Sequence, residues 1–282
     1  MSDKVFKRIQ LVLLVIVLII FCFSFYKVFT IVMEYRAGRE EYKALEEDFV
    51  KIEEVTKPPV EQETPKPSAE DTDNSTETSE EPEEIVINYY DDFKQVSVDF
   101  KSLENINPDF EGWLYVPALS ISYPVVLGTD NSYYLTHTFQ KSENSAGTLF
   151  LDQATTNPFE NYNTIIHGHN MKNGSMFGKL KNFYRNTETY ASDPYFYVYT
   201  DGKAYKYFIF SYYVTNSTSD TYQLPASEES YQNYKEYVTK SAVYRELEGI
   251  PDSAPIVTLS TCYGDSYTDL RLVVHGILVA TE

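Results

Sequence analysis

The chain has 282 residues, a net charge of −19 and only two cysteines. Lysine and arginine are nowhere concentrated, which excludes proteins that grip nucleic acid through a basic surface. Cys22 lies in a long apolar run and cannot pair with Cys262 in one folded unit, so a domain held together by disulfides is excluded as well.

The first predicted element is a membrane-spanning helix over residues 9–33. Residues 11–26 read LVLLVIVLIIFCFSFY, and Lys27 is followed by a second apolar run. About 20 apolar residues can cross the hydrocarbon core of a bilayer. The run is too long for a cleaved signal peptide, and no small-residue cleavage site follows it. Basic residues lie on both sides of the span, so they give little indication of its orientation.

The next segment, 34–84, is predicted to be an acidic stalk that spaces a folded domain from the membrane. Its first part, 35–57, is charged and could continue the helix. Residues 58–84 are rich in Pro, Glu, Ser and Thr and nearly free of large apolar side chains. Such a segment cannot bury enough surface to offset its ordering entropy, and its acidic charge favours an extended chain.

The folded domain is predicted over residues 85–282, a length that suits one domain with a real core. Large apolar residues recur at helical spacing from Phe93 to Leu103 and predict an amphipathic helix over 92–103. A second, polar helix is predicted over 228–247.

Most of the domain is predicted to be β, because short β-branched or aromatic runs alternate with turn residues. Asp201-Gly202 is a strong hairpin signal. Many short strands with few helices indicate a closed or nearly closed barrel. The predicted strands are 113–116, 121–126, 148–151, 164–167, 195–200, 204–215, 256–261 and 270–280.

Cys262 is the candidate nucleophile. Residues 255–262 read PIVTLSTC, so an apolar strand carries the thiol at its end, and Tyr263-Gly264-Asp265 turns the chain away. The strand holds the backbone at this position rigidly, and the side chain is expected to be open to a substrate. A buried structural cysteine is the commoner fate of a free thiol, and reactivity requires a neighbouring base or cation.

The four histidines are the candidate bases. A thiol of ordinary pKa, about 8.5, needs an imidazole that takes its proton and later protonates a leaving amine. His137 lies in a polar stretch, and His275 fits a structural place in a strand. His167 and His169 flank Gly168 where a strand ends, so they can project into a groove. No third and fourth metal ligand has suitable spacing, so no metal site is predicted.

Arg271 lies on the strand predicted after Cys262. Two antiparallel strands joined by a short loop would bring both side chains to one rim. A guanidinium stays charged and offers a rigid fork of donors, which can stabilise an oxyanion or hold a substrate carbonyl. Alternatively, Arg271 is a surface residue paired with Asp265 or Asp269.

Three motifs in this order resemble the class B sortases: NTIIHGHNM at 163–171, TLSTC at 258–262 and LRLVVHG at 270–276. Segments 112–126, 128–139 and 173–180 are also similar. The resemblance extends from about Phe93 to the last residue. It implies a mainly β fold, namely an eight-stranded sortase-type barrel with an N-terminal helix and a long helix before the nucleophile's strand.

The resemblance also implies an activity, and no cofactor. A sorting motif near the C terminus of a secreted surface protein would be cleaved with formation of a thioester on Cys262. An amine of peptidoglycan or of its lipid-linked precursor would then accept the acyl group. His169 would act as acid and base, and Arg271 would stabilise the oxyanion or position substrate.

Three alternatives to wall anchoring stay open. One is a pilus-assembling enzyme with a pilin lysine as acceptor. Another is a thiol protease, a hydrolase that would give only hydrolysis when an amine is added. The third is a catalytically silent binding module tethered to the surface.

The resemblance further implies a substrate groove, for which matching residues are Asn131, Leu135, Thr218, Tyr222 and Ser260. His167 is a departure, because class B enzymes commonly have tyrosine before this glycine, so a groove-wall residue is changed.

Sortases act outside the cell, at the surface of Gram-positive bacteria. The resemblance therefore implies a single-pass protein of the plasma membrane, with residues 1–8 in the cytoplasm and the domain outside. An anchor of this kind raises the effective concentration of a membrane-borne second substrate.

Overall fold

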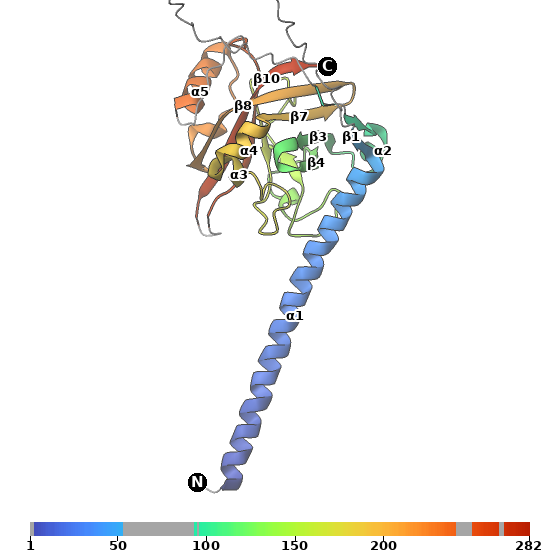
Figure 1. The fold of residues 1–282 in the computed structure, drawn as a ribbon, viewed down its shortest axis with the longest axis vertical. Helices are drawn as coiled ribbons and strands as arrows, with labels where there is room; N and C mark the ends of the chain where they lie inside the picture. The colour runs from blue at the N-terminus through green and yellow to red at the C-terminus, as the bar shows by residue number, and fades with distance from the viewer. Residues whose placement is uncertain (1–2, 53–92, 95, 241–249, 265–267) are drawn as a thin grey trace, which may run out of the picture.

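A closed barrel of eight β-strands forms the body of the protein, and one very long helix, α1 (Asp3–Phe49), projects from it (Figure 1). The computed structural model describes residues 3–52, 93–94, 96–240, 250–264 and 268–282. The predicted barrel and its closure are confirmed.

Around the barrel the strands follow the order β10-β8-β7-β3-β4-β5-β6-β9. The β4–β5 and β6–β9 pairs are parallel, and the other neighbours are antiparallel. Each of the eight strands predicted from alternation and turn residues is present, with small differences at the ends. They are β3 (Phe110–Val116), β4 (Ile121–Val126), β5 (Leu149–Leu151), β6 (Asn163–His167), β7 (Tyr195–Thr200), β8 (Lys203–Asn216), β9 (Ile256–Cys262) and β10 (Leu270–Thr281).

The Asp201-Gly202 hairpin turn is also confirmed. It joins β7 to β8, and Gly202 has a φ of 78°. Glycine adopts this left-handed conformation without the steric strain that a Cβ would bring. The predicted polar helix is α5 (Glu228–Lys240), and the remaining residues of that prediction, 241–247, lie outside the described part of the chain.

The amphipathic helix predicted over 92–103 is wrong in its first half. Residues Val96–Val98 form a strand, β2, which pairs antiparallel with β1 (Val50–Ile52), and the helix α2 begins only at Phe100. The side chain of Asp99 accepts a hydrogen bond from the Ser102 amide at 3.0 Å and so caps the helix. The strand depends on a partner 46 residues earlier in the chain, which a local pattern cannot reveal.

The first part of the predicted stalk, residues 34–49, is helical, as the sequence allowed, and residues Val50–Ile52 form β1. Helix α1 continues unbroken past the apolar segment, and its last turns pack against the barrel. The side chains of Tyr42 and Leu45 are buried there, as is Val50 in the strand that follows. Tyr42 and Leu45 share one side of an otherwise charged part of the helix, and that narrow apolar stripe is enough to dock it. Residues 53–84, the rest of the predicted stalk, and 85–92, where the domain was expected to begin, lie outside the described residues.

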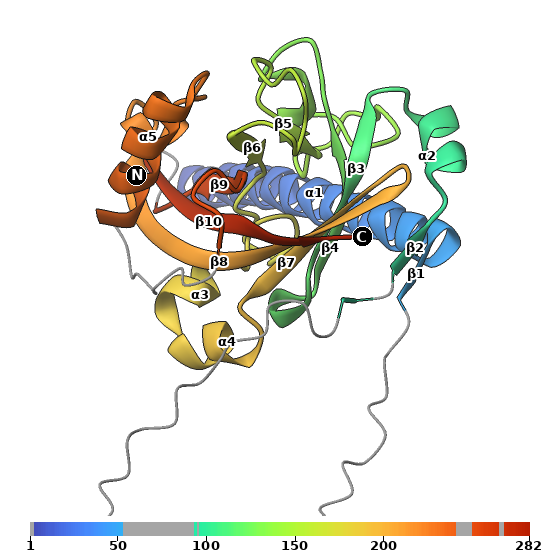
Figure 2. The ribbon, with the colours of Figure 1, turned by 90° about the horizontal axis from the view of Figure 1, so that it is seen from above.

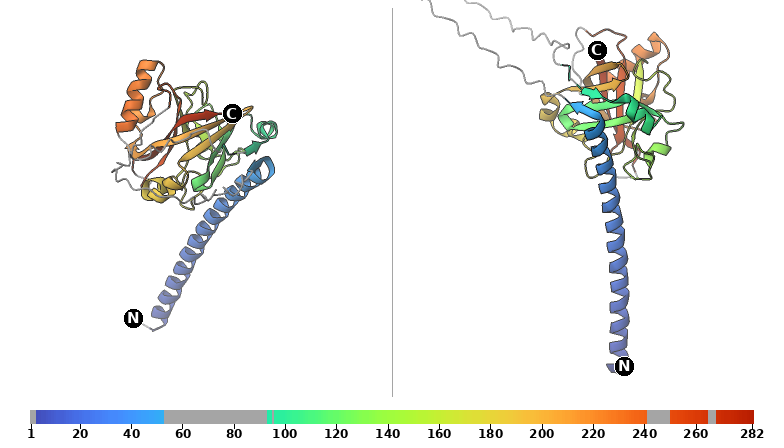
Figure 3. Two further views of the ribbon diagram at one scale, coloured as in Figure 1. Left: turned by 45° about the horizontal axis from the view of Figure 1, so that its top comes forward. Right: turned by 90° about the vertical axis from the view of Figure 1, so that its right-hand side faces the viewer.

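The N-terminal part of α1 stands clear of the barrel in both views of Figure 3. Its most apolar stretch has a mean hydropathy of 2.8, and none of that stretch is buried by the rest of the protein. The helix is long and apolar enough to cross a membrane, by length and composition, as the sequence predicts.

Two apolar clusters hold the domain together. The larger fills the barrel and includes the fully buried Trp113. The smaller lies between α5 and the β8–β10 side of the barrel, on a different side from α1 (Figure 2). Short helices that the sequence did not predict complete the fold: α3 (Lys181–Arg185), α4 (Thr187–Ser192) and the 3₁₀ turns η1 (Pro117–Leu119), η2 (Tyr133–Leu135) and η3 (Asp220–Tyr222).

Candidate active site

Cys262 is the last residue of β9, and its side chain is exposed. Arg271 lies directly opposite it on β10, because the antiparallel register pairs the two residues. Residues opposed in this way have their side chains on the same face of the sheet. The expectation that the two strands bring Cys262 and Arg271 to one rim is confirmed.

The guanidinium of Arg271 is only partly exposed. Its Nη1 donates to its neighbour's carbonyl, Leu270 O, at 3.1 Å, and its Nη2 lies 3.7 Å from Asp269 Oδ1. The surface pairing with Asp269 therefore exists, but it is long, and an exposed ion pair of this kind contributes little to stability. Because the guanidinium has five N–H donors, these contacts leave donors for a substrate.

His169 follows β6, the strand that pairs parallel with β9. Its Nε2 lies 2.7 Å from Leu135 O. A carbonyl only accepts hydrogen bonds, so Nε2 carries the hydrogen and Nδ1 is the nitrogen of the neutral ring that can take a proton. A backbone carbonyl from another segment thus sets both the orientation and the tautomer of this imidazole.

A cavity of about 400 Å³ lies between these residues. It is lined by the three predicted catalytic residues, by five of the six predicted groove residues, and by five others that the sequence did not single out. In chain order the lining is Asn131, Leu135, Phe150, Asp152, His167, Gly168, His169, Ser217, Tyr222, Ser260, Thr261, Cys262 and Arg271.

Thr218 is the predicted groove residue that does not line the cavity. Its hydroxyl and its amide both bond to Asn216 Oδ1, at 3.0 and 3.1 Å. This side-chain turn at the end of β8 holds Thr218 away from the cavity, and Ser217 takes its place in the lining.

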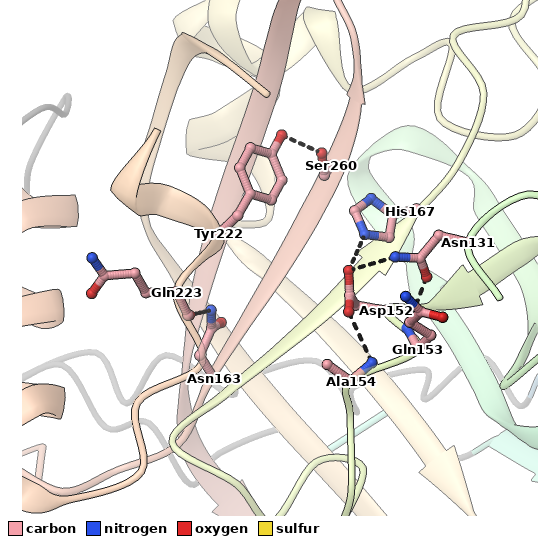
Figure 4. Close-up of polar contacts among 9 residues, drawn as sticks. All are labelled: Asn131, Asp152, Gln153, Ala154, Asn163, His167, Tyr222, Gln223 and Ser260. Atoms are coloured by element: carbon pink, nitrogen blue, oxygen red, sulfur yellow. Dashed lines mark hydrogen bonds and ion pairs between the residues drawn. The ribbon is translucent and has the colours of Figure 1, made fainter. Parts of the chain in front are cut away.

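His167 is held by a polar network at the wall of the cavity (Figure 4). Its Nε2 lies 3.3 Å from Asp152 Oδ2, which also accepts from Asn131 Nδ2 at 2.9 Å. Asp152 Oδ1 accepts from the Ala154 amide at 3.0 Å. The hydrogen bond from His167 is the main cause that lowers the pKa of Asp152, so this group is a carboxylate at neutral pH. The amide of Gln153 donates to Asn131 Oδ1 at 2.8 Å and fixes the other end of the network.

The ring of His167 lies near two aromatic rings, those of Phe150 and Tyr222. Ring centroids are 5.3 Å apart for Phe150 and 6.2 Å apart for Tyr222, and the Tyr222 ring is nearly parallel to the imidazole. The hydroxyl of Tyr222 lies 2.8 Å from Ser260 Oγ (Figure 4), and burial raises the pKa of Tyr222, so it remains a neutral phenol. Asn163 Nδ2 donates to the backbone oxygen next to Tyr222, Gln223 O, at 3.0 Å and anchors that turn.

Gly168 allows the two neighbouring histidines to approach the barrel wall. A Cβ at this position would lie 2.4 Å from Leu149 Cδ2 and 2.7 Å from Phe177 Cδ2. Two residues further on, Asn170 Nδ2 donates to Cys262 O at 2.9 Å and ties this segment to the end of β9. Asn170 was missed in the sequence, although it belongs to the same motif as His169.

The other two histidines lie outside the cavity. His275 is fully buried, bonds through Nδ1 with Thr258 Oγ1 at 2.9 Å, and has its pKa lowered by burial to about 3. It is therefore the neutral structural residue that its strand pattern suggested. His137 stacks on Tyr133 and bonds to the carbonyl of that residue. Among the described residues, no group of three or more His, Cys, Asp or Glu side chains could hold a metal ion.

Comparison with known proteins agrees with this geometry. The family model of the sortase domain matches residues 114–279. Sortase B of Listeria monocytogenes is 34% identical over 189 residues, which cover 66% of this chain and 76% of that protein.

Among solved structures, Clostridium perfringens sortase B is 32% identical, with a TM-score of 0.59 over 64% of this chain and 99% of that one. A sortase B structure from B. anthracis is 28% identical, with a TM-score of 0.63 over 88% of this chain and 99% of that one. The chain therefore belongs to the sortase family of cysteine transpeptidases, and the relatives that it resembles are sortase B enzymes.

Proposed function

We propose that this enzyme cleaves a sorting motif in secreted proteins through Cys262 and transfers the acyl group to an amine of peptidoglycan or its lipid-linked precursor. The observation that carries the proposal is the pairing of Cys262 with Arg271 at the rim of a cavity that His169 also lines. The similarity to sortase B enzymes supports the same class of reaction.

Acyl transfer would proceed in two steps. The Cys262 thiol gives its proton to His169 as its sulfur attacks the scissile carbonyl carbon, and Arg271 donates hydrogen bonds to the oxyanion that forms. The C–N bond then breaks, His169 protonates the leaving amine, and a thioester remains. In the second step the acceptor amine attacks the thioester, His169 takes the amine's proton, and an amide forms as the thiolate leaves.

The cavity wall would read the sorting motif. Asn131, Leu135, Tyr222 and Ser260 offer polar and apolar contacts along it. His167 also lines the wall, and its Nε2 donates to Asp152. The other ring nitrogen, Nδ1, is therefore a hydrogen-bond acceptor in the neutral ring. Figure 4 shows this nitrogen on the side of the ring away from Asp152. His167 would therefore select a motif residue whose side chain donates a hydrogen bond.

The enzyme would work at the outer face of the plasma membrane, with α1 as its anchor and residues 1–8 in the cytoplasm. The apolar, unburied part of α1 supports its role as the anchor. An anchored enzyme meets a membrane-borne acceptor at a raised effective concentration.

The test uses the full chain in detergent micelles, incubated with a library of pentapeptide motifs with and without candidate amines, and read by mass. We expect one motif to give an amine adduct, and the relative rates with a peptidoglycan amine and a lysine peptide to distinguish wall anchoring from pilus assembly. Hydrolysis alone in the presence of every amine would identify a protease. Adduct formation that persists in Cys262→Ala would reject the proposal.

A further inference from the structure

The helix that is apolar enough to span a membrane also reaches the loop beside the candidate active site. The C-terminal part of α1 runs along the barrel, as both views of Figure 3 show. There it contacts residues 136–148, which connect η2 to β5 and which we call the bracing loop. Leu135, whose carbonyl holds His169, directly precedes this loop.

Tyr42 makes the central contact between α1 and the bracing loop. Its side chain is 5% exposed, and its hydroxyl donates to Gly147 O at 2.5 Å. The same hydroxyl lies 3.1 Å from Thr148 Oγ1 and accepts from the Phe139 amide at 3.2 Å. One phenol thus joins the two ends of the bracing loop to the helix.

Residues of α1 that precede Tyr42 also contact the bracing loop. Glu34 Oε1 accepts from the Ser145 amide at 2.6 Å, and the Glu34 carbonyl accepts from Asn144 Nδ2 at 3.0 Å. One helical turn later a Cβ on Gly38 would lie only 3.1 Å from Asn144 Oδ1, so helix and loop approach closely. Glu41 Oε1 accepts from the amide of Gln140 at 3.0 Å.

The bracing loop in turn lies close against the backbone that holds His169. A Cβ on Gly147 would lie 2.4 Å from Tyr134 O and 3.0 Å from Leu135 O, and the φ of Gly147 is +61°. The amide of Thr148 donates to Tyr134 O at 2.9 Å. Leu135 O then lies 2.7 Å from His169 Nε2. The contacts are contiguous from Tyr42 through Gly147 and Leu135 to the imidazole.

We propose that Tyr42 is a positioning residue for His169, and that the membrane-anchoring helix sets the orientation of this imidazole through the bracing loop. The inference rests on the proposed function, in which His169 is the acid and base. It makes the anchor part of the active-site framework, because a shift of α1 against the barrel would move the carbonyl of Leu135. A displaced imidazole lowers the rate of proton transfer more than the binding of peptide.

The test is Tyr42→Phe in the full chain in micelles, with kcat and KM for acyl transfer measured across pH. The ring keeps its packing, and only the hydroxyl is lost. We expect kcat to fall about threefold to tenfold, the effect of losing well-placed hydrogen bonds, while KM changes little. The limb of the kcat/KM profile that reports His169 should shift.

Tyr190→Phe is the matched control. Tyr190, in α4, is 6% exposed, and its hydroxyl donates to Ile209 O in β8 at 2.6 Å. The Tyr190→Phe variant loses a comparable buried hydroxyl and leaves the contacts to Leu135 unchanged. We expect wild-type kcat and pH dependence in this variant, even if its midpoint of unfolding falls as in Tyr42→Phe.

A spectroscopic readout separates positioning from stability. The chain has only four histidines, so ¹⁵N-histidine labelling gives few ring signals, and His169→Ala identifies those of His169. We expect these signals to move in Tyr42→Phe and to stay in Tyr190→Phe. If Tyr42→Phe does not fold, Glu34→Ala decides, because Glu34 is partly exposed and its carboxylate holds only the edge of the loop.

Unchanged His169 signals and unchanged kcat in the folded variant, Tyr42→Phe or Glu34→Ala, would overturn the proposal. Failure of the proposed function gives a different result: the wild-type chain would transfer no acyl group from any motif. The positioning role would then still be supported if the His169 signals moved in Tyr42→Phe.

Discussion

Cys262 and Arg271 face each other across the antiparallel pair of β9 and β10. Opposed Cα atoms in such a pair are roughly 4.5–5.5 Å apart, and the main-chain hydrogen bonds of the ladder keep them there. Both side chains are therefore carried by rigid strands, whereas His169 lies just beyond the end of β6 and depends on the carbonyl of Leu135. This difference determines which substitutions should affect chemistry and which should affect stability.

Arg271→Lys should lose most activity. An ammonium keeps the positive charge but cannot reproduce the planar fork, and loss of one oxyanion donor costs about a hundredfold or more in kcat. Steady-state acyl transfer to an amine measures the effect. Arg185→Lys, on the exposed side of α3, is the control and should keep normal turnover. Near-normal turnover in Arg271→Lys would show that only charge is needed there.

His169→Ala and His167→Ala should differ in kind. The first removes the proposed acid and base, so we expect kcat to fall about a hundredfold to ten-thousandfold with every motif. The second removes a wall residue held by Asp152, so we expect a change in the ranking of motifs with smaller loss on the best one. Competition between motif peptides, read by mass, measures both. The reverse pattern would show that His167 is the base.

Gly168→Ala should reduce both stability and activity. Its Cβ would overlap Leu149 and Phe177, and overpacking of a core typically costs about 1–3 kcal/mol. The displaced backbone carries His167 and His169, so kcat should fall as well. Unfolding by urea, followed through the fluorescence of the single, buried Trp113, gives the stability.

Gly202→Ala is the matched control for that experiment. Its φ of +78° makes alanine strained, at a cost of about 1–2 kcal/mol, but nothing lies within 4 Å of the new Cβ. This variant should be less stable and fully active. If Gly168→Ala were also fully active, the histidines would not depend on the close approach at Gly168.

His275 should make the barrel less stable as the pH falls from 7 to 5. Its pKa is lowered from 6.5 to about 3 in the folded protein, so in this window the unfolded chain binds a proton that the folded chain does not. Stability therefore rises with pH, and the linkage amounts to about 2 kcal/mol between pH 5 and pH 7.

His275→Gln should show a smaller fall over the same range, whatever its stability at pH 7. Urea titrations of both proteins at the two pH values, followed by Trp113 fluorescence, measure the difference. Equal falls in the two proteins would mean that His275 titrates alike in the folded and unfolded states.

Much of the barrel could be predicted from local patterns. The β7–β8 hairpin was readable from two β-rich runs around Asp201-Gly202, and the end of β9 from the apolar run before Cys262. The strand Val96–Val98 was misassigned because its partner is β1, and pairing with a distant segment overrides a helical spacing. The docking of α1 was missed because only a narrow stripe around Tyr42 and Leu45 is apolar in a charged segment.

In the candidate site, too, some features could be predicted from local sequence and others could not. The positions of Cys262, Arg271 and His169 at strand ends could be predicted, since strand ends are marked by changes of composition. The sequence did not indicate a role for Asp152. That role depends on a hydrogen bond with His167, which the β5–β6 pairing brings beside it. Thr218 was expected to line the groove and does not, because the turn around Asn216 cannot be read from composition.

Local patterns were enough to predict the apolar helix, the strands of the barrel and the strand ends that carry Cys262 and Arg271, because each depends on periodicity or order along a short stretch. What surrounds these elements depends on the tertiary structure. The carbonyl of Leu135 holds His169, and Tyr42 holds the loop that lies beside Leu135. These contacts join segments far apart in the chain, and they form only when the closed barrel and the docked helix fix those segments against each other.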